Sequence, residues 1–127
     1  MRYLLDTCAL IWLGMGGGDL SANAVRRISV ASSLHYSSIS AWEIARLRKE
    51  GKVAIPNDPA DFIADLSAMY GLSAIPPDDE IMLRAANLPD FHKDPADRII
   101  IATAFVHNLT IVTGDNKFAQ YGVQTLC

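Results

Sequence analysis

The stretch YLLDTCALIWL, residues 3–13, decides the fold class. Its first three residues are apolar and predict a short strand that ends at Asp6, and Ala9–Leu13 continues as an apolar segment that predicts a helix. A strand followed directly by a helix is the first half of a βαβ unit, whose strands lie parallel in one sheet. An acidic residue at the end of such a strand lies where open parallel sheets bind ligands.

Short apolar runs alternate with helical patterns along the rest of the chain. Further strands are expected at residues 34–39, 72–75, 110–113 and 123–126. Helices are expected between them, beginning at Ser21, Ser40, Asp58-Pro59, Asp78 and Asp94-Pro95. No Pro- or Ser-rich linker divides the chain, so we expect residues 1–127 to form a single α/β domain around a mainly parallel sheet.

Composition narrows the kind of protein further. Half of the 127 residues are hydrophobic, which excludes a disordered chain. Eleven Lys and Arg against 14 Asp and Glu give a net charge of -3, which argues against binding nucleic acid through basic charge alone. Two cysteines are too few for a disulfide scaffold, and the apolar run Cys8–Leu13 is too short to span a membrane. We therefore expect a cytoplasmic protein.

Four carboxylates stand where a parallel sheet gathers its functional groups. Asp6 and Asp115 each follow a short apolar strand. Glu43 and Asp97 each lie in the first turn of an expected helix. Strand carboxyl ends and helix N-termini share one edge of such a sheet, so all four side chains can point into one crevice. A purely local interpretation is also open, because Ser40 and Glu43 match a capping box and the other three acids can cap a helix or form a turn.

The four carboxylates together favour a metal site. Four caps at one edge would gather about four negative charges within several ångströms, which raises pKa values and opposes folding. A divalent cation removes this repulsion, and oxygen ligands without paired histidines or cysteines favour Mg²⁺ or Mn²⁺ over Zn²⁺. Such an ion lowers the pKa of bound water and clamps phosphate oxygens. The sequence therefore favours phosphodiester hydrolysis.

Basic residues lie beside the predicted site. Four of them follow Glu43 on the same helix and turn: Arg46, Arg48, Lys49 and Lys52. They fit contact with RNA and fit a solvated helix face equally well. Arg98 is expected to pair with an acid of the site or to bind phosphate.

The three histidines are expected to be surface or structural residues, because no serine–histidine–acid order accompanies them. They are His35, His92 and His107.

Four ordered motifs carry a resemblance to a known family. They are Leu4-Leu5-Asp6-Thr7, Ser40-x-Trp42-Glu43-Ile44, His92-Lys93-Asp94-Pro95-Ala96-Asp97-Arg98 and Thr113-Gly114-Asp115. In this order they resemble the PIN-domain nucleases and, more narrowly, the VapC-type toxins of bacterial and archaeal toxin–antitoxin pairs. The resemblance covers essentially the whole chain.

The resemblance implies a three-layer α/β/α fold and a metal-dependent endoribonuclease. By it, Asp6, Glu43 and Asp97 match the three core metal-binding acids, Asp115 matches a fourth and more variable acid, and Thr113 matches a supporting hydroxyl. It also implies an RNA substrate, an antitoxin protein that covers a groove near the site, and a homodimer.

Two features of the chain depart from the family pattern. Cys8 stands where the family frequently has histidine, and the glycine run Gly14–Gly18 is unusual for it.

Three other functions fit some of these acids. A receiver-like signalling module also binds magnesium through acids, but it needs an acid pair after the first strand, where Asp6 stands alone. A phosphatase of the haloacid-dehalogenase type needs a second acid at the position of Cys8. A degenerate binding module on the PIN fold remains as an alternative, although all four acids are present.

Overall fold

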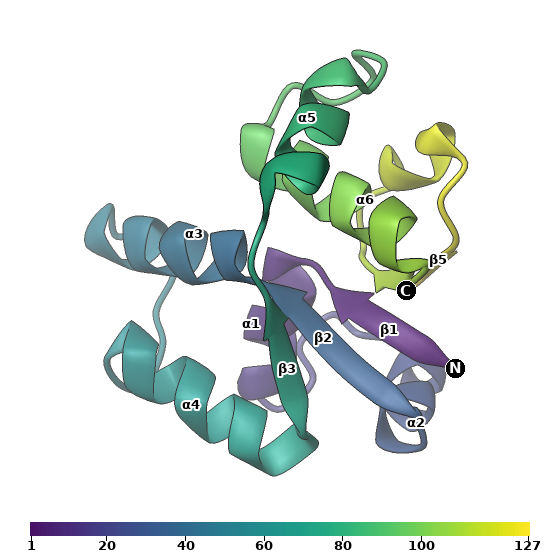
Figure 1. Cartoon of the computed structure of the whole chain (residues 1–127). Coiled ribbons are helices and arrows are strands. Elements are labelled where there is room, and N and C mark those ends of the chain that lie inside the picture. Colours follow the sequence, from purple (N-terminus) through teal and green to yellow (C-terminus); the bar gives the residue numbers. More distant parts are fainter.

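A five-stranded sheet lies at the centre of the computed structural model, which describes residues 1–127 (Figure 1). Its strands are β1 (Arg2–Leu5), β2 (Ser33–Ser37), β3 (Leu72–Ile75), β4 (Thr110–Val112) and β5 (Thr125–Leu126). They lie in the order β3-β2-β1-β4-β5, and every neighbouring pair is parallel. The expected parallel sheet is confirmed, and it is parallel throughout.

Helices cover both faces of this sheet. One face packs against four of them: α1 (Thr7–Gly14), α2 (Ala22–Ser29), α3 (Ser38–Lys49) and α4 (Pro59–Tyr70). The other face packs against α6 (Pro95–His107) and the short 3-10 helix η1 (Phe118–Tyr121), while α5 (Asp79–Asn87) packs on α6. The expected three-layer α/β/α fold is therefore confirmed (Figure 1).

The central strand β1 explains why residues 3–5 are all apolar. Tyr3 and Leu5 contribute to the core on the α1 side, and Leu4 contributes to the core on the α6 side. A strand buried on both faces has no solvent side for a polar residue, so its pattern is continuous rather than alternating. Asp6 is the first polar residue after this run, directly where the strand ends.

The strand order places a crevice beside β1. The chain runs outward through β2 and β3 on one side of β1 and through β4 and β5 on the other. Ligands of open parallel sheets bind where the order reverses in this way. The order differs from the 2-1-3-4-5 order of receiver modules, so the receiver-like alternative is wrong. No helix has the length and apolar character needed to cross a membrane.

The start of α3 differs from the expectation. Ser37, not Ser40, is the N-cap residue, and its hydroxyl accepts a hydrogen bond from the amide of Ile39 at 3.2 Å. Ser40 is fully buried inside the first turn, where its hydroxyl lies 2.9 Å from that of Thr7. The capping-box interpretation of Ser40 and Glu43 is therefore wrong.

The C-terminal strand and the glycine run are two more places where the structure adds to the sequence prediction. The strand expected at 123–126 is reduced to Thr125–Leu126, and the sequence did not predict η1 before it. After α1, Gly16, Gly17 and Gly18 have φ angles of 86°, 112° and 50°. This turn lies in the left-handed region that glycine enters without strain, which explains the run.

Candidate metal centre

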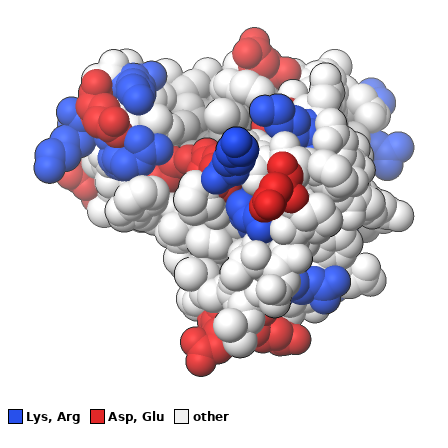
Figure 2. Space-filling view, turned by 90° about the horizontal axis from the view of Figure 1, so that it is seen from above, with Lys and Arg blue, Asp and Glu red and all other residues white.

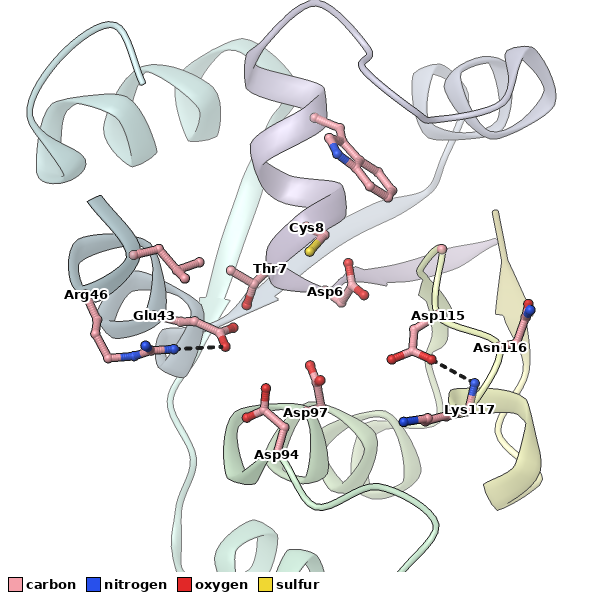
Figure 3. A pocket seen from close by; sticks show the side chains of 13 residues that line it. Asp6, Thr7, Cys8, Glu43, Arg46, Asp94, Asp97, Asp115, Asn116 and Lys117 are labelled. Atoms are coloured by element: carbon pink, nitrogen blue, oxygen red, sulfur yellow. Dashed lines mark hydrogen bonds and ion pairs between the residues drawn. The ribbon is translucent and has the colours of Figure 1, made fainter. Parts of the chain in front are cut away.

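A pocket of about 750 Å³ opens at the carboxyl ends of β1 and β4. Figure 3 shows its side chains, which come from α1, α3, α6 and the loop after β4. Five of the lining residues are acids: Asp6, Glu43, Asp94, Asp97 and Asp115. Only Arg46 and Lys117 bring positive charge to the lining. The structure thus brings the four predicted acids into one pocket.

Asp6 is both a helix cap and a pocket residue. Its Oδ1 accepts from the amide of Ala9 at 2.8 Å, as an N-cap carboxylate does, and its Oδ2 accepts from the hydroxyl of Thr113 at 2.5 Å. Burial raises the pKa of Asp6 to about 6, against the lowering effect of these two hydrogen bonds; the charges of Asp115 and Glu43 also raise it. Asp6 therefore caps α1 and at the same time presents its carboxylate to the pocket.

Asp97 lies in the first turn of α6, three residues after the N-cap residue Asp94. Burial raises the pKa of Asp97 to about 8, and the negative charge of Asp94 adds to this, followed by those of Glu43, Asp6 and Asp115. Asp94 was expected only as the start of the helix, but it also lines the pocket. The ionised form of Asp97 is therefore disfavoured by burial and by the nearby negative charges.

Glu43 is buried on α3 and its carboxylate points toward Asp97 across the pocket (Figure 3). Because Ser37 caps the helix, nothing in the cap occupies this side chain. Its one ionic partner is Arg46, at 3.9 Å. Since Arg46 lies 2.6 Å from Glu50, its charge is shared with an acid outside the pocket.

Asp115 is held in place by two hydrogen bonds. Its Oδ1 accepts from the amide of Lys117 at 2.9 Å, which forms the expected turn, and its Oδ2 lies 3.0 Å from Nε2 of His92. Burial raises the pKa of Asp115, but the Lys117 amide and the His92 ring outweigh it, and the pKa is lowered. Thr113 accepts from the amide of Asp115 at 3.0 Å, so one hydroxyl joins Asp6 and Asp115.

His92 is the site residue that the sequence analysis missed. Its Nε2 lies 2.9 Å from Oδ2 of Asp97 as well as 3.0 Å from Oδ2 of Asp115. The expectation of a surface residue is wrong for His92, because its side chain is only 11% exposed, while a structural role stays a prediction. The available signal was its position five residues before Asp97 in the same loop and helix start.

Arg98 does not reach the acids of the pocket. Its guanidinium donates to the backbone carbonyls of Pro89 and His92, and also to those of Ala85 and Leu88 at the end of α5. Its only acidic partner is Asp90, whose Oδ1 lies 3.4 Å from the guanidinium. Asp90 does not line the pocket. The expected pairing of Arg98 with a site acid is therefore wrong, because Arg98 instead joins the α5–α6 loop to α6.

The other basic residues lie on one side of the pocket. Of the four predicted for RNA contact, only Arg46 lines it, while Arg48, Lys49 and Lys52 are exposed towards and beyond the end of α3. Figure 2 shows basic and acidic side chains interspersed over this end of the molecule. Lys117, on the opposite side, also lines the pocket.

Two more residues shape the mouth of the pocket. A Cβ at Gly114 would lie 2.9 Å from Cη2 of Trp12, so the loop that carries Asp115 passes the indole where only glycine fits. Cys8 also lines the pocket, and burial together with the neighbouring acids, Asp6 first, raises the pKa of its thiol to about 11. Cys8 therefore stays a neutral thiol at neutral pH.

We compared the sequence and the fold of this chain with those of known proteins. The model of the PIN domain family matches residues 3–124. The chain belongs to the PIN domain family. It is 29% identical over 119 residues to "Ribonuclease VapC22" of Mycobacterium tuberculosis, covering 93% of this chain and 90% of that protein. The resemblance to VapC-type proteins is confirmed by this relative.

Two solved structures share the fold. A toxin–antitoxin complex from Klebsiella pneumoniae aligns with a TM-score of 0.69 and 22% identity, covering 98% of this chain and 96% of that one. VapBC2 from Rickettsia felis, bound to a DNA fragment from its promoter, aligns with a TM-score of 0.71 and 16% identity, covering 99% and 98%.

The donor set of this PIN domain fits a hard divalent cation. Asp6, Glu43 and Asp97 converge from three elements and present carboxylate oxygens, which Mg²⁺ and Mn²⁺ prefer. Burial first, and the charges of the neighbouring acids second, raise the pKa values of Asp6 and Asp97, so the metal-free pocket disfavours their charged forms. A cation among them would supply the missing positive charge.

Proposed function

We propose that this PIN domain, residues 1–127, is a Mg²⁺- or Mn²⁺-dependent endoribonuclease that acts as the toxin of a toxin–antitoxin pair. The observation that carries the proposal is that Asp6, Glu43 and Asp97 converge in one pocket although they lie far apart in the sequence. This pocket opens beside β1, where the strand order of the parallel sheet reverses. The relative named a ribonuclease supports RNA as the substrate.

Each acid has a distinct role in this proposal. Asp6 and Asp97 coordinate the ion directly, and Glu43 does so directly or through a water molecule. Asp115 holds a second ion or orients the attacking water, and Thr113 fixes both Asp6 and Asp115 through its hydroxyl. When bound, the ion supplies an activated water and charge stabilisation at the phosphate.

RNA reaches the pocket along its basic side. We propose that Arg46, Arg48, Lys49 and Lys52 contact the RNA backbone next to the site. Each phosphate contact to a single strand contributes about 0.7 to the slope of log affinity against log salt concentration, so replacing Arg48 and Lys49 with glutamine should lower that slope by about 1.4. Arg27→Gln is the control, because Arg27 lines a separate hollow at the amino ends of the strands. An unchanged slope in the double variant would remove these residues from the interface.

The partners of the toxin role are a second part of the proposal. Solved relatives of this fold were determined as toxin–antitoxin complexes, which supports an antitoxin that covers this PIN domain. We also propose a homodimer that acts in the cytoplasm. A short neighbouring gene for a DNA-binding protein supports the toxin role, and a gene without such a neighbour weakens it.

Cleavage of total RNA tests the nuclease. The purified protein should cleave RNA with Mg²⁺ or Mn²⁺ and stop when a chelator is added, and Asp6→Asn and Asp97→Asn should each abolish cleavage. Asp61→Asn is the matched control, since this exposed acid on α4 lies outside the pocket and its replacement changes the net charge equally. Cleavage that persists with chelator, or in both site variants, overturns the assignment.

A further inference from the structure

His92 is largely buried and is held by contacts to both its backbone and its ring. Its backbone amide donates to the hydroxyl of Tyr121 at 2.7 Å, and its carbonyl accepts from Arg98 at 3.1 Å. Its ring packs edge-on against Phe118, with centroids 5.8 Å apart, and its side chain is only 11% exposed. Three contacts, two with η1 and one with α6, therefore hold His92 in place before any ligand arrives.

The two ring nitrogens of His92 have different partners. Nδ1 accepts a hydrogen bond from the backbone amide of Asp94 at 3.3 Å. A nitrogen that accepts from an amide carries no proton, so the proton of the neutral ring lies on Nε2. That N–H donates to Oδ2 of Asp115 at 3.0 Å, and Oδ2 of Asp97 lies 2.9 Å from the same nitrogen.

This tautomer distinguishes between two roles. His92, Asp97 and Asp115 lie close enough together to be three ligands of one ion, since their nearest donor atoms are within 4.8 Å of one another. A ligand role, however, needs a lone pair on Nε2 and hence a proton on Nδ1, which would then point at the N–H of Asp94. The local hydrogen bonding opposes that arrangement.

We infer that His92 is a positioning residue of the metal centre, whose Nε2–H holds Asp115 beside Asp97 without coordinating the ion. This inference rests on the proposed metal-dependent function. The N–H occupies Oδ2 of Asp115, on the loop after β4, and the imidazole keeps that carboxylate beside Oδ2 of Asp97 on α6. It also leaves the ligand set entirely of oxygen atoms, as Mg²⁺ prefers.

Metal affinity measures this role without relying on activity. We expect His92→Ala to weaken Mg²⁺ binding about 10- to 100-fold in isothermal titration calorimetry, which is the usual cost of losing a group that orients a ligand. His92→Gln places an amide N–H near the position of Nε2 and should restore the affinity to within about threefold of the original chain. His107→Ala, an exposed histidine at the end of α6, is the control. Unchanged affinity in His92→Ala, or failure of the glutamine variant to rescue it, overturns the inference.

The tautomer can be read from the unmodified chain. Long-range ¹H–¹⁵N spectra of the imidazoles should show His92 with its proton on Nε2, both without metal and with saturating Mg²⁺. Loss of that proton on adding Mg²⁺ would make His92 a ligand and overturn the inference. Mg²⁺-dependent RNA cleavage in the same preparation would leave the proposed function standing in that case, whereas absence of Mg²⁺ binding would overturn both.

Discussion

At the scale of single residues, Asp97 is the carboxyl group whose pKa is raised furthest in the metal-free protein. Burial and the nearby acids raise its pKa from 3.8 to about 8, so the folded chain binds this proton more tightly than the unfolded chain does. Stability is greatest where Asp97 is protonated and falls as the pH rises towards about 8. In chelator, the melting temperature should therefore fall as the pH rises from about 4 to about 8 and level off above pH 8.

Asp97→Asn should flatten this pH dependence. Removing the charge should raise the melting temperature of the metal-free protein at pH 8 by about 4 °C, which corresponds to about 1 kcal/mol for a domain of this size. Asp61→Asn, the exposed acid on α4, should keep the original slope. Equal slopes in the original chain and Asp97→Asn would show that the pKa of Asp97 is not raised in the folded protein.

Thr113 carries a second residue-scale prediction. Its buried hydroxyl donates to Asp6 and accepts from the amide of Asp115, so Thr113→Val leaves two polar groups without partners. We expect a loss of about 1–3 kcal/mol in the free energy of unfolding, measured by urea denaturation. Thr113→Ser keeps the hydroxyl and should lose less. A valine variant as stable as the original would contradict this role.

The sequence could reveal acids that directly follow strands, but not the contact between His92 and Asp115, which joins two loops. Asp6 and Asp115 are recognisable because each follows an apolar strand in a regular alternation. His92 meets Asp115 only because the loop before α6 folds against the loop after β4, 23 residues later in the chain. No local pattern records that contact, so the histidine looked like an isolated surface residue.

At the scale of elements, Arg98 couples α5 to α6. The final carbonyls of a helix lack partners within it, and the guanidinium of Arg98 serves those of Ala85 and Leu88 together with the Pro89 and His92 carbonyls of the loop. Arg98→Ala should therefore cost about 2–3 kcal/mol in the free energy of unfolding, as hydrogen bonds from a charged donor usually do.

The size of the loss in Arg98→Lys separates two roles of this residue. A lysine cannot spread its donors over the five backbone carbonyls that Arg98 contacts, so this variant should recover only part of the lost stability. Had Arg98 bound phosphate instead, Arg98→Ala would leave urea denaturation unchanged and lower only the affinity for RNA. Denaturation curves of the two variants, measured alongside RNA binding, decide between these outcomes.

The boundaries of α3 show why elements are easier to predict than their ends. The helix itself was predicted from its apolar spacing, but its N-cap residue was placed three residues late. Ser37 and Ser40 both suit an N-cap by residue type. The buried contact between the hydroxyls of Ser40 and Thr7 comes from another helix, so only the tertiary packing decides between them.

At the scale of the whole molecule, the strand order converts scattered acids into one charged site. Alternation of strands and helices predicted parallel pairing, but β1 lies between β2 and β4 through contacts that no periodicity encodes. The resulting pocket concentrates five acids in a chain whose net charge is only -3. Fold stability and cation binding must therefore be linked.

That linkage predicts that Mg²⁺ stabilises the folded chain. An ion that binds only the folded state contributes about 2.7 kcal/mol when its concentration is a hundred times the dissociation constant, so the melting temperature should rise markedly in excess Mg²⁺ or Mn²⁺. The rise should be larger at pH 8 than at pH 6, because the cation must displace protons from Asp6 and Asp97, whose pKa values are about 6 and about 8. NaCl at equal ionic strength is the control for screening, and Asp6→Asn should blunt the rise. If neither cation moves the melting temperature, the acids of the pocket bind no ion, and the hydrolase proposal loses its physical basis.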